Sequence, residues 1–264
     1  MSGNSCFITG VRTAIEAKLF PTENDVRSAI EELQWWHTID LPGGFRTPGH
    51  QRIEEQEFIA RNIPQDLSGK TVLDVGANDG YFSFLAEKRQ AAKVVAIDVF
   101  QGNKPEEGRV GIGQNGKSFL KTFALAKKAL KSNVIYENMD LFEIESLPLT
   151  FDLIFLFGVY YHLEDPVKGL QTAVKKLNPG GLLLFEGLVR AGNQKPNLHR
   201  FMESEIEPTT FLSANIAWII DAFHNTGMEK VGTVSLLRYK SSLLNIIVKL
   251  GWALSTNIAL QEGV

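Results

Sequence analysis

The stretch VLDVGANDGYF, Val72 to Phe82, decides the fold of this chain. It runs from an apolar strand through a turn containing Gly76 and Gly80 into a helical pattern. The dinucleotide fingerprint G-x-G-x-x-G requires its second glycine where Asn78 stands here, and its third glycine is missing. Asparagine tolerates a positive φ, so Asn78 can take the glycine-like position without disrupting the turn. The stretch therefore predicts a strand, a tight turn and a helix that bind a nucleotide-like ligand.

Two carboxylates at predicted strand ends define that ligand more closely. Asp74 lies at the end of the strand TVLDV, and Asp98 ends the next strand, KVVAID, about 20 residues beyond the turn. Open α/β sheets bind ligands at the C-terminal edge of the strands, and an acid placed like Asp98 accepts the hydroxyls of a ribose. The sequence therefore predicts a ribose-containing ligand that need not carry a pyrophosphate.

Apolar runs alternate with amphipathic ones along most of the chain. Such alternation predicts an α/β fold with a mostly parallel sheet and helices on both faces. The runs 228–237 and 242–254 predict a C-terminal antiparallel hairpin. The other strands are expected at 71–75, 93–98, 133–139, 151–158 and 181–187, and the helices at 54–62, 81–90, 117–131, 167–177 and 215–227.

Composition restricts the class of protein. A chain of 264 residues with 44% hydrophobic and 22% charged residues is globular and can bury a full core. The net charge of -3 counts against tight, charge-driven binding of nucleic acid. The single cysteine, Cys6, forms no intrachain disulfide, and the first residues carry no signal-peptide pattern. The run 242–254 is shorter than the roughly 20 residues of a spanning helix. We expect a cytoplasmic protein without a membrane partner.

The N-terminal part, up to about residue 66, lacks the alternating strand and helix patterns of the rest of the chain. Residues 21–36 predict a helix, and residues 35–51, rich in Gly and Pro, predict a loop. We expect residues 1–66 to form a helical segment with a lid loop, and residues 67–264 to form the ligand-binding domain. The histidines of polar loops, His37, His50 and His199, are expected to be solvent-exposed. The candidates for contacting a substrate are His37, Arg46 and His199.

Several motifs in order resemble one family. The DVGANDG turn, Asp98, Asp140 after NVIYENM, FDLIFLFGVYYHLEDP and the NPGG turn together resemble the class I S-adenosylmethionine-dependent methyltransferases over about residues 67 to 240. The segments WWHTIDLPGGFRTPG and GVYYHLEDP resemble the subgroup typified by the tRNA wobble-uridine (5-hydroxyuridine) carboxymethyltransferase. The resemblance implies a Rossmann-like methyltransferase fold with S-adenosylmethionine as cofactor.

The resemblance also assigns residues to parts of the cofactor. Asp98 would hold the ribose hydroxyls, and Asp140 with Leu141 would flank the adenine. Phe157 and Tyr161 match positions that line the donor sulfonium. Four residues of the turn would face the methionine and ribose: Asp74, Gly76, Asn78 and Gly80.

The chain departs from the carboxymethyltransferase in one respect. That enzyme holds a carboxylated donor with lysines and a tryptophan upstream of the first motif. The lysine positions fall near Trp35 to His37 and near Glu54 here, and none of these is a lysine. Plain methyl transfer is therefore predicted.

The segment YYH follows the strand FDLIFLFG and supplies two candidate catalytic residues. An imidazole has an ordinary pKa of about 6.5, which suits it to accept a proton from an acceptor hydroxyl. His162 is therefore a candidate base, and Tyr161 is a candidate for positioning a ligand by a hydrogen bond. Alternatively, His162 caps the helix that starts near Asp165. Asp98 and Asp140 could likewise be helix N-caps.

A rival motif is GIGQNGKS, Gly111 to Ser118, which matches the phosphate-binding loop G-x-x-x-x-G-K-S. The preceding QGNKPEEGRV contains no apolar strand, so an NTPase is only a remote alternative. No carboxylate and asparagine cluster indicates a catalytic metal. The main prediction is methyl transfer to a hydroxyl or amine of a small molecule, and the alternative is a tRNA wobble-uridine methyl- or carboxymethyltransferase.

Overall fold

The architecture follows from a computed structural model of the chain. It describes residues 23–99, 117–190, 195–200, 210, 212–227, 231–240, 243–251 and 260–262. Most of the GIGQNGKS segment and Cys6 lie outside these residues, so the structure does not describe the rival phosphate-loop motif.

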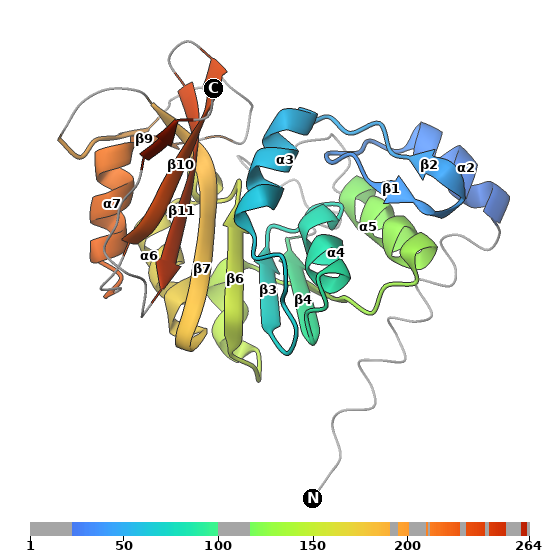
Figure 1. Ribbon diagram of the computed structural model, residues 1–264, viewed down its shortest axis with the longest axis horizontal. Helices are drawn as coiled ribbons and strands as arrows, with labels where there is room; N and C mark the ends of the chain where they lie inside the picture. Colours follow the sequence, from blue (N-terminus) through green and yellow to red (C-terminus); the bar gives the residue numbers. More distant parts are fainter. Residues whose placement is uncertain are drawn as a thin grey trace, which may run out of the picture.

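The larger sheet has the spatial strand order β12-β10-β11-β7-β6-β3-β4-β5 (Figure 1). Strands β7, β6, β3, β4 and β5 are parallel to their neighbours in this order, whereas β11 is antiparallel to both β7 and β10. The predicted parallel sheet with a C-terminal antiparallel hairpin is confirmed. The bounds are Leu260–Glu262 (β12), Val231–Lys240 (β10), Leu243–Gly251 (β11), Leu177–Arg190 (β7), Phe151–Phe157 (β6), Thr71–Val75 (β3), Lys93–Asp98 (β4) and Ile135–Asn138 (β5).

The apolar residues of each central strand point alternately to two faces of the sheet, as a side-chain period of two requires. Leu73 belongs to a core cluster with residues of α6 and α7, and Val72 belongs to another cluster with residues of α3, α4 and α5. Figure 1 shows α4 and α6 on opposite sides of the sheet. The helices are α2 (Glu23–Glu32), α3 (Ile53–Asn62), α4 (Tyr81–Lys88), α5 (Lys117–Leu130), α6 (Pro166–Lys175) and α7 (Ile216–His224).

Two regions differ from the predicted elements. The Gly- and Pro-rich segment 35–51 contains a small antiparallel hairpin, β1 (Asp40–Leu41) and β2 (Phe45–Arg46), joined by the short 3₁₀ helix η1 (Pro42–Gly44). Strand β7 begins at Leu177 and continues through the NPGG sequence. Gly180, within this strand, adopts a φ of +78°. A short pair, β8 (Leu198–Arg200) and β9 (Leu212–Asn215), extends from the end of β7.

None of the helices in the described residues is both long and apolar enough to span a membrane.

Candidate active site

The turn after β3 is held in a conformation that favours glycine. Gly76, Asn78 and Gly80 all have a positive φ, at 72°, 51° and 90°. Gly80 is the N-cap of α4, and a Cβ placed on it would lie 2.6 Å from the Phe123 ring. The predicted roles of the two glycines and of Asn78 in shaping the turn therefore have a direct steric cause.

Asp98 fixes this turn to the end of β4. Its Oδ2 accepts a 2.7 Å hydrogen bond from the backbone N–H of Asn78, and its Oδ1 accepts one of 2.7 Å from Val99. The N–H groups of Gly76 and Ala77 donate to the carbonyl of Ile97 at 2.9 and 3.0 Å. Each carboxylate oxygen of Asp98 keeps a lone pair for a further donor, such as a ribose hydroxyl.

Asp74 lies beneath the turn with only 2% of its surface exposed. The Ser83 hydroxyl on α4 donates to Asp74 Oδ2 at 2.5 Å. Burial raises the pKa of Asp74 to about 6, and the bond from Ser83 opposes this rise only in part. Burial also raises the pKa of Asp98 to about 6, against the opposing bonds from Asn78 and Val99. Both acids are therefore ionised at neutral pH at a cost, which a cationic or hydroxyl-bearing ligand would offset.

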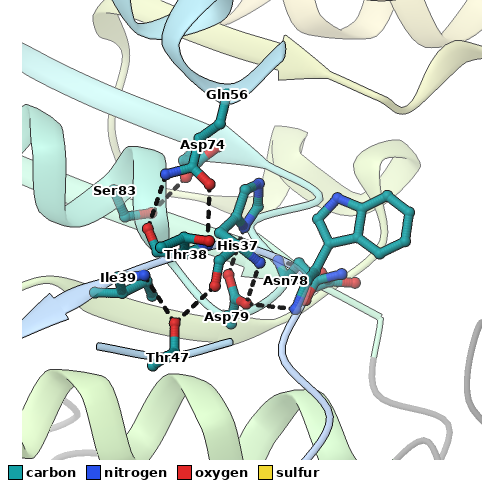
Figure 2. A network of polar contacts seen from close by, with 11 residues as sticks. His37, Thr38, Ile39, Thr47, Gln56, Asp74, Asn78, Asp79 and Ser83 are labelled. Carbon is teal, nitrogen blue, oxygen red and sulfur yellow. Dashed lines mark hydrogen bonds and ion pairs between the residues drawn. The ribbon is translucent and has the colours of Figure 1, made fainter. Parts of the chain in front are cut away.

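Asp79 attaches the N-terminal segment to the same turn, as Figure 2 shows. Its Oδ2 accepts backbone hydrogen bonds of 2.8 Å from Trp36 and from His37, and its Oδ1 lies 2.5 Å from Nδ1 of His37. Asp79 is fully buried, and His37 is 5% exposed. The prediction that His37 lies exposed in a polar loop is wrong, because a buried carboxylate 42 residues away holds it.

Residues 36–47, which we call the strap, are joined further by side-chain bonds (Figure 2). Gln56 on α3 accepts from the N–H of Thr38 at 2.9 Å and donates to its carbonyl at 2.8 Å. The Thr47 hydroxyl accepts from Ile39 at 2.7 Å and donates to the carbonyl of His37 at 2.8 Å. The strap therefore has a defined path along the turn.

A row of aromatic rings leads from the strap to the end of β6. The imidazole of His37 stacks on Tyr81 and meets Phe82 edge to face, with ring centroids 5.5 and 5.1 Å apart. Phe82 in turn meets Phe157 at 5.0 Å. Phe157, predicted to line the donor sulfonium, is 8% exposed at the end of β6, beside the cofactor turn.

The YYH segment forms the 3₁₀ helix η3 (Tyr160–His162). Tyr160 is core: it is fully buried, and its hydroxyl donates to the carbonyl of Leu188 and accepts from Ala214 at 3.2 Å. Tyr161 and His162 are half-buried, with ring centroids 4.5 Å apart. Asp165 itself caps α6 by accepting from the N–H of Lys168 at 2.9 Å, so the interpretation of His162 as that cap is wrong.

The other predicted residues fall into two groups. Asp140 is the N-cap of η2 (Leu141–Ser146) and forms a capping box with Glu143, which confirms the alternative prediction that Asp140 is a helix N-cap. The Leu141 side chain is buried in the core. The N–H of Met139 donates to the carbonyl of Asp98 at 3.1 Å, so Asp140 lies near Asp98. Arg46 instead forms an exposed ion pair with Asp40 at 2.6 Å, and the exposed His199 lies on β8. The structure brings neither of these two into the polar network around the turn.

Sequence reasoning missed three residues of this region. Asp79 and Ser83 lie in the VLDVGANDGYFSF stretch, but their partners are set by tertiary contacts. Glu186 could have been found, because a lone acid in the apolar run GLLLFEGL is rarely buried without a role. Glu186 lies on β7 and is 5% exposed. Its carboxylate lies 3.9 Å from the position that a Cβ on Gly158 would take, and the Tyr161 hydroxyl lies 3.2 Å from the same position.

The arrangement suits a cofactor with a ribose and an amino acid portion. Asn78 Oδ1 is buried and has no hydrogen-bond partner within the part of the chain that the structure describes, an unusual state for an amide oxygen, and it belongs to the turn that Asp98 and Asp79 hold. A ligand donor at this point would satisfy it. Asp74, Asn78 and Asp98 therefore offer acceptors for the hydroxyl and ammonium groups of S-adenosylmethionine.

Comparison with known proteins agrees with this geometry. The family of the methyltransferase domain matches residues 49–218. The chain is 26% identical over 218 residues to a tRNA U34 carboxymethyltransferase from Desulfotalea psychrophila, covering 78% of this chain and 60% of that protein. It is 34% identical over 148 residues to the protein of that name from Campylobacter hominis, covering 54% of this chain and 45% of that one. The chain thus spans about half the length of these relatives.

Solved structures share the fold. The N-terminal domain of EvdMO1, solved with S-adenosylhomocysteine and D-fucose, has a TM-score of 0.60 at 16% identity and covers 86% of this chain and 95% of that one. An S-adenosylmethionine-dependent methyltransferase from Mesorhizobium loti has a TM-score of 0.51 at 16% identity, covering 74% and 97%. Since the family match includes the turn, Asp98 and the parallel core of the sheet, the chain belongs to this methyltransferase family and is a class I enzyme that uses S-adenosylmethionine.

Proposed function

We propose that this enzyme transfers a plain methyl group to a hydroxyl, and that a wobble uridine of tRNA is the first acceptor to test. The observation that carries the acceptor is the identity of 34% over 148 residues to a protein named tRNA U34 carboxymethyltransferase. The main expectation from the sequence was a small-molecule acceptor. The relatives favour its alternative, a tRNA.

The residues at the positions of the carboxylate-binding lysines support plain methyl transfer rather than carboxymethyl transfer. Trp35 is 3% exposed, and the imidazole of His37 is engaged by the carboxylate of Asp79. Glu54 is exposed and lies 3.8 Å from Arg52 in a surface ion pair. None of these positions presents a cation to a second carboxylate on the donor, and an unpaired buried carboxylate is costly.

A small-molecule hydroxyl is the second candidate acceptor. The net charge of -3 counts against charge-driven binding of the RNA backbone. In either case residues 1–66 would act as a lid on the acceptor side of the domain 67–264. The hydrogen bonds from Trp36 and His37 to Asp79, in the turn after β3, support this arrangement. The cytoplasmic location predicted from the sequence is part of this proposal.

One experiment separates the two acceptors. The enzyme is incubated with S-adenosylmethionine carrying a tritiated methyl group, together with either total tRNA or the low-molecular-weight fraction of a cell extract. Label in a uridine nucleoside after nuclease digestion supports the tRNA acceptor. Label confined to the small-molecule fraction supports the second candidate, and label on nitrogen rather than oxygen contradicts a hydroxyl acceptor.

A further inference from the structure

The strap and the turn together build a histidine–carboxylate pair that the sequence did not reveal. Oδ2 of Asp79 accepts two backbone hydrogen bonds, from Trp36 and His37, and its Oδ1 lies 2.5 Å from Nδ1 of the His37 imidazole. When Nδ1 donates to this carboxylate, the lone pair of the neutral ring lies on Nε2.

The second ring nitrogen of His37, Nε2, forms no hydrogen bond with any described residue. Nor is Nε2 among the buried side-chain polar atoms that lack a partner in the described chain, which are Gln51 Oε1, Glu55 Oε1 and Asn78 Oδ1. The small part of His37 that remains exposed therefore includes Nε2, while the ring packs against Tyr81 and Phe82.

The pair contacts the β6 side of the site through aromatic rings. Strands β4 and β6 flank β3 on opposite sides. Asp98, the ribose-side acid, ends β4, whereas His37 reaches the end of β6 through the contacts of Phe82 with Phe157. The carboxylates that interact with the imidazole are those of Asp79 and, at longer range, Asp74.

We propose that His37, oriented by Asp79, is the base that removes the proton from the methyl-accepting hydroxyl. As the acceptor oxygen forms its bond to the methyl carbon, the carbon–sulfur bond breaks and its electron pair stays on sulfur. The hydroxyl proton passes to Nε2, and the resulting imidazolium is stabilised by the Asp79 carboxylate until the proton is released to water. This inference rests on the proposed transfer to a hydroxyl, and a base of this kind contributes about 10²- to 10⁴-fold.

The variant Asp79→Asn tests the role of the carboxylate. The asparagine oxygen can keep the two backbone bonds, but its amide N–H₂ then faces Nδ1 of His37. The ring must accept there and carry its proton on Nε2, where it can no longer act as a base. We expect ring ¹⁵N NMR to show this change of tautomer, methyl transfer to fall at least 100-fold, and the Kd for S-adenosylhomocysteine to change less than threefold.

His37→Gln should lose activity to the same extent, and His50→Gln is its control. His50 is an exposed histidine whose ring packs on Trp36, so its variant should keep the wild-type rate. A His37→Gln enzyme that retains more than a third of the rate would overturn the proposal. So would a loss of cofactor affinity that equals the loss of rate, because His37 would then only anchor the cofactor or the fold.

A measurement on the wild-type enzyme needs neither a variant nor an acceptor. S-adenosylmethionine carries one positive charge more than S-adenosylhomocysteine, at the sulfur, so exchanging one for the other should shift the ¹⁵N signal of His37 Nε2 but not that of His224 on α7. An unmoved His37 signal would overturn the placement of the base and leave the proposed function intact. An enzyme that methylates no hydroxyl compound would instead overturn the proposed acceptor, and the inference with it.

Discussion

The backbone N–H of Asn78 donates a 2.7 Å hydrogen bond to Oδ2 of Asp98 and so joins the turn after β3 to the end of β4. Asn78 adopts a φ of 51° in this turn. It fixes one oxygen of Asp98 while Val99 fixes the other. The carboxylate that we expect to bind the ribose is therefore oriented before the cofactor arrives, which lowers the entropic cost of binding.

Removing this carboxylate should weaken cofactor binding. We expect Asp98→Ala to raise the Kd for S-adenosylhomocysteine at least tenfold in titration calorimetry, because the ribose hydroxyls lose a charged acceptor. Lys117→Ala, at the start of α5, is the control and should leave that Kd unchanged. Tight ATP binding that is lost in Lys117→Ala would instead support the phosphate-loop reading.

Local patterns in the sequence predicted the scaffold well. The strands of the parallel core follow from continuous apolar runs, and the positive φ values of the turn follow from glycine and asparagine, because both signals depend only on neighbouring residues. The position of Asp98 at the end of β4 follows in the same way.

The contacts that complete the site were not predictable in this way. His37 and Asp79 are 42 residues apart, and each has ordinary neighbours in the sequence. The pairing arises because the strap crosses the N-terminus of α4, a tertiary arrangement without a periodic signal. For the same reason the segment 35–51 was predicted as a loop, although its short β1 and β2 strands pair across η1.

The burial of Asp74 should make the stability of the protein depend on pH. Its folded-state pKa of about 6 lies above the value of 3.8 expected when the chain is unfolded. Its contribution to stability is therefore fully present below pH 4 and is lost as the pH rises through 6. Asp74→Asn removes the buried charge, and its amide oxygen can still accept from Ser83. We expect the variant to be more stable than wild type at pH 8 by up to about 3 kcal/mol.

Urea unfolding at pH 4, 6 and 8 measures this difference. The stability advantage of Asp74→Asn should be smallest at pH 4 and grow with pH. Asp98 has a raised pKa as well, but it titrates in both proteins and largely cancels from the comparison. An advantage that is equal at all three pH values would contradict the buried-charge explanation. If Asp74 contacts the cofactor as we expect, the variant should also bind S-adenosylmethionine more weakly.

The glycine that begins α4 should tolerate no side chain. Gly80→Ala imposes a φ of +90° on alanine and places its Cβ 2.6 Å from Phe123 and 2.7 Å from Phe84. Gly180→Ala is a matched control, because Gly180 has a φ of +78° but no atom within 4 Å of its Cβ position. We expect Gly180→Ala to cost about 1–2 kcal/mol in unfolding free energy from backbone strain alone. Gly80→Ala should cost more, and equal costs would show that Phe123 and Phe84 move aside freely.

The choice of donor provides a separate prediction. Because Trp35, Trp36 and His37 offer no cation to a second carboxylate, plain S-adenosylmethionine should bind at least as tightly as its carboxylated form. A competition experiment with both donors, read by the mass added to the product, measures this preference. A preference for the carboxylated donor by orders of magnitude would restore carboxymethyl transfer as the reaction.

The two histidines near the site should behave differently when each is removed. His162 follows β6 on η3, where the sequence predicts a base, and its ring meets Tyr161 edge to face with centroids 4.5 Å apart, whereas Nδ1 of His37 lies 2.5 Å from the Asp79 carboxylate. We therefore expect His162→Ala to lower kcat less than tenfold, against at least 100-fold for His37→Gln. Tyr161→Phe should mainly raise KM, because a tyrosine hydroxyl, with an ordinary pKa of about 10, positions a ligand rather than removing its proton. The reverse result, with His162→Ala nearly inactive and its cofactor Kd unchanged, would place the base on η3.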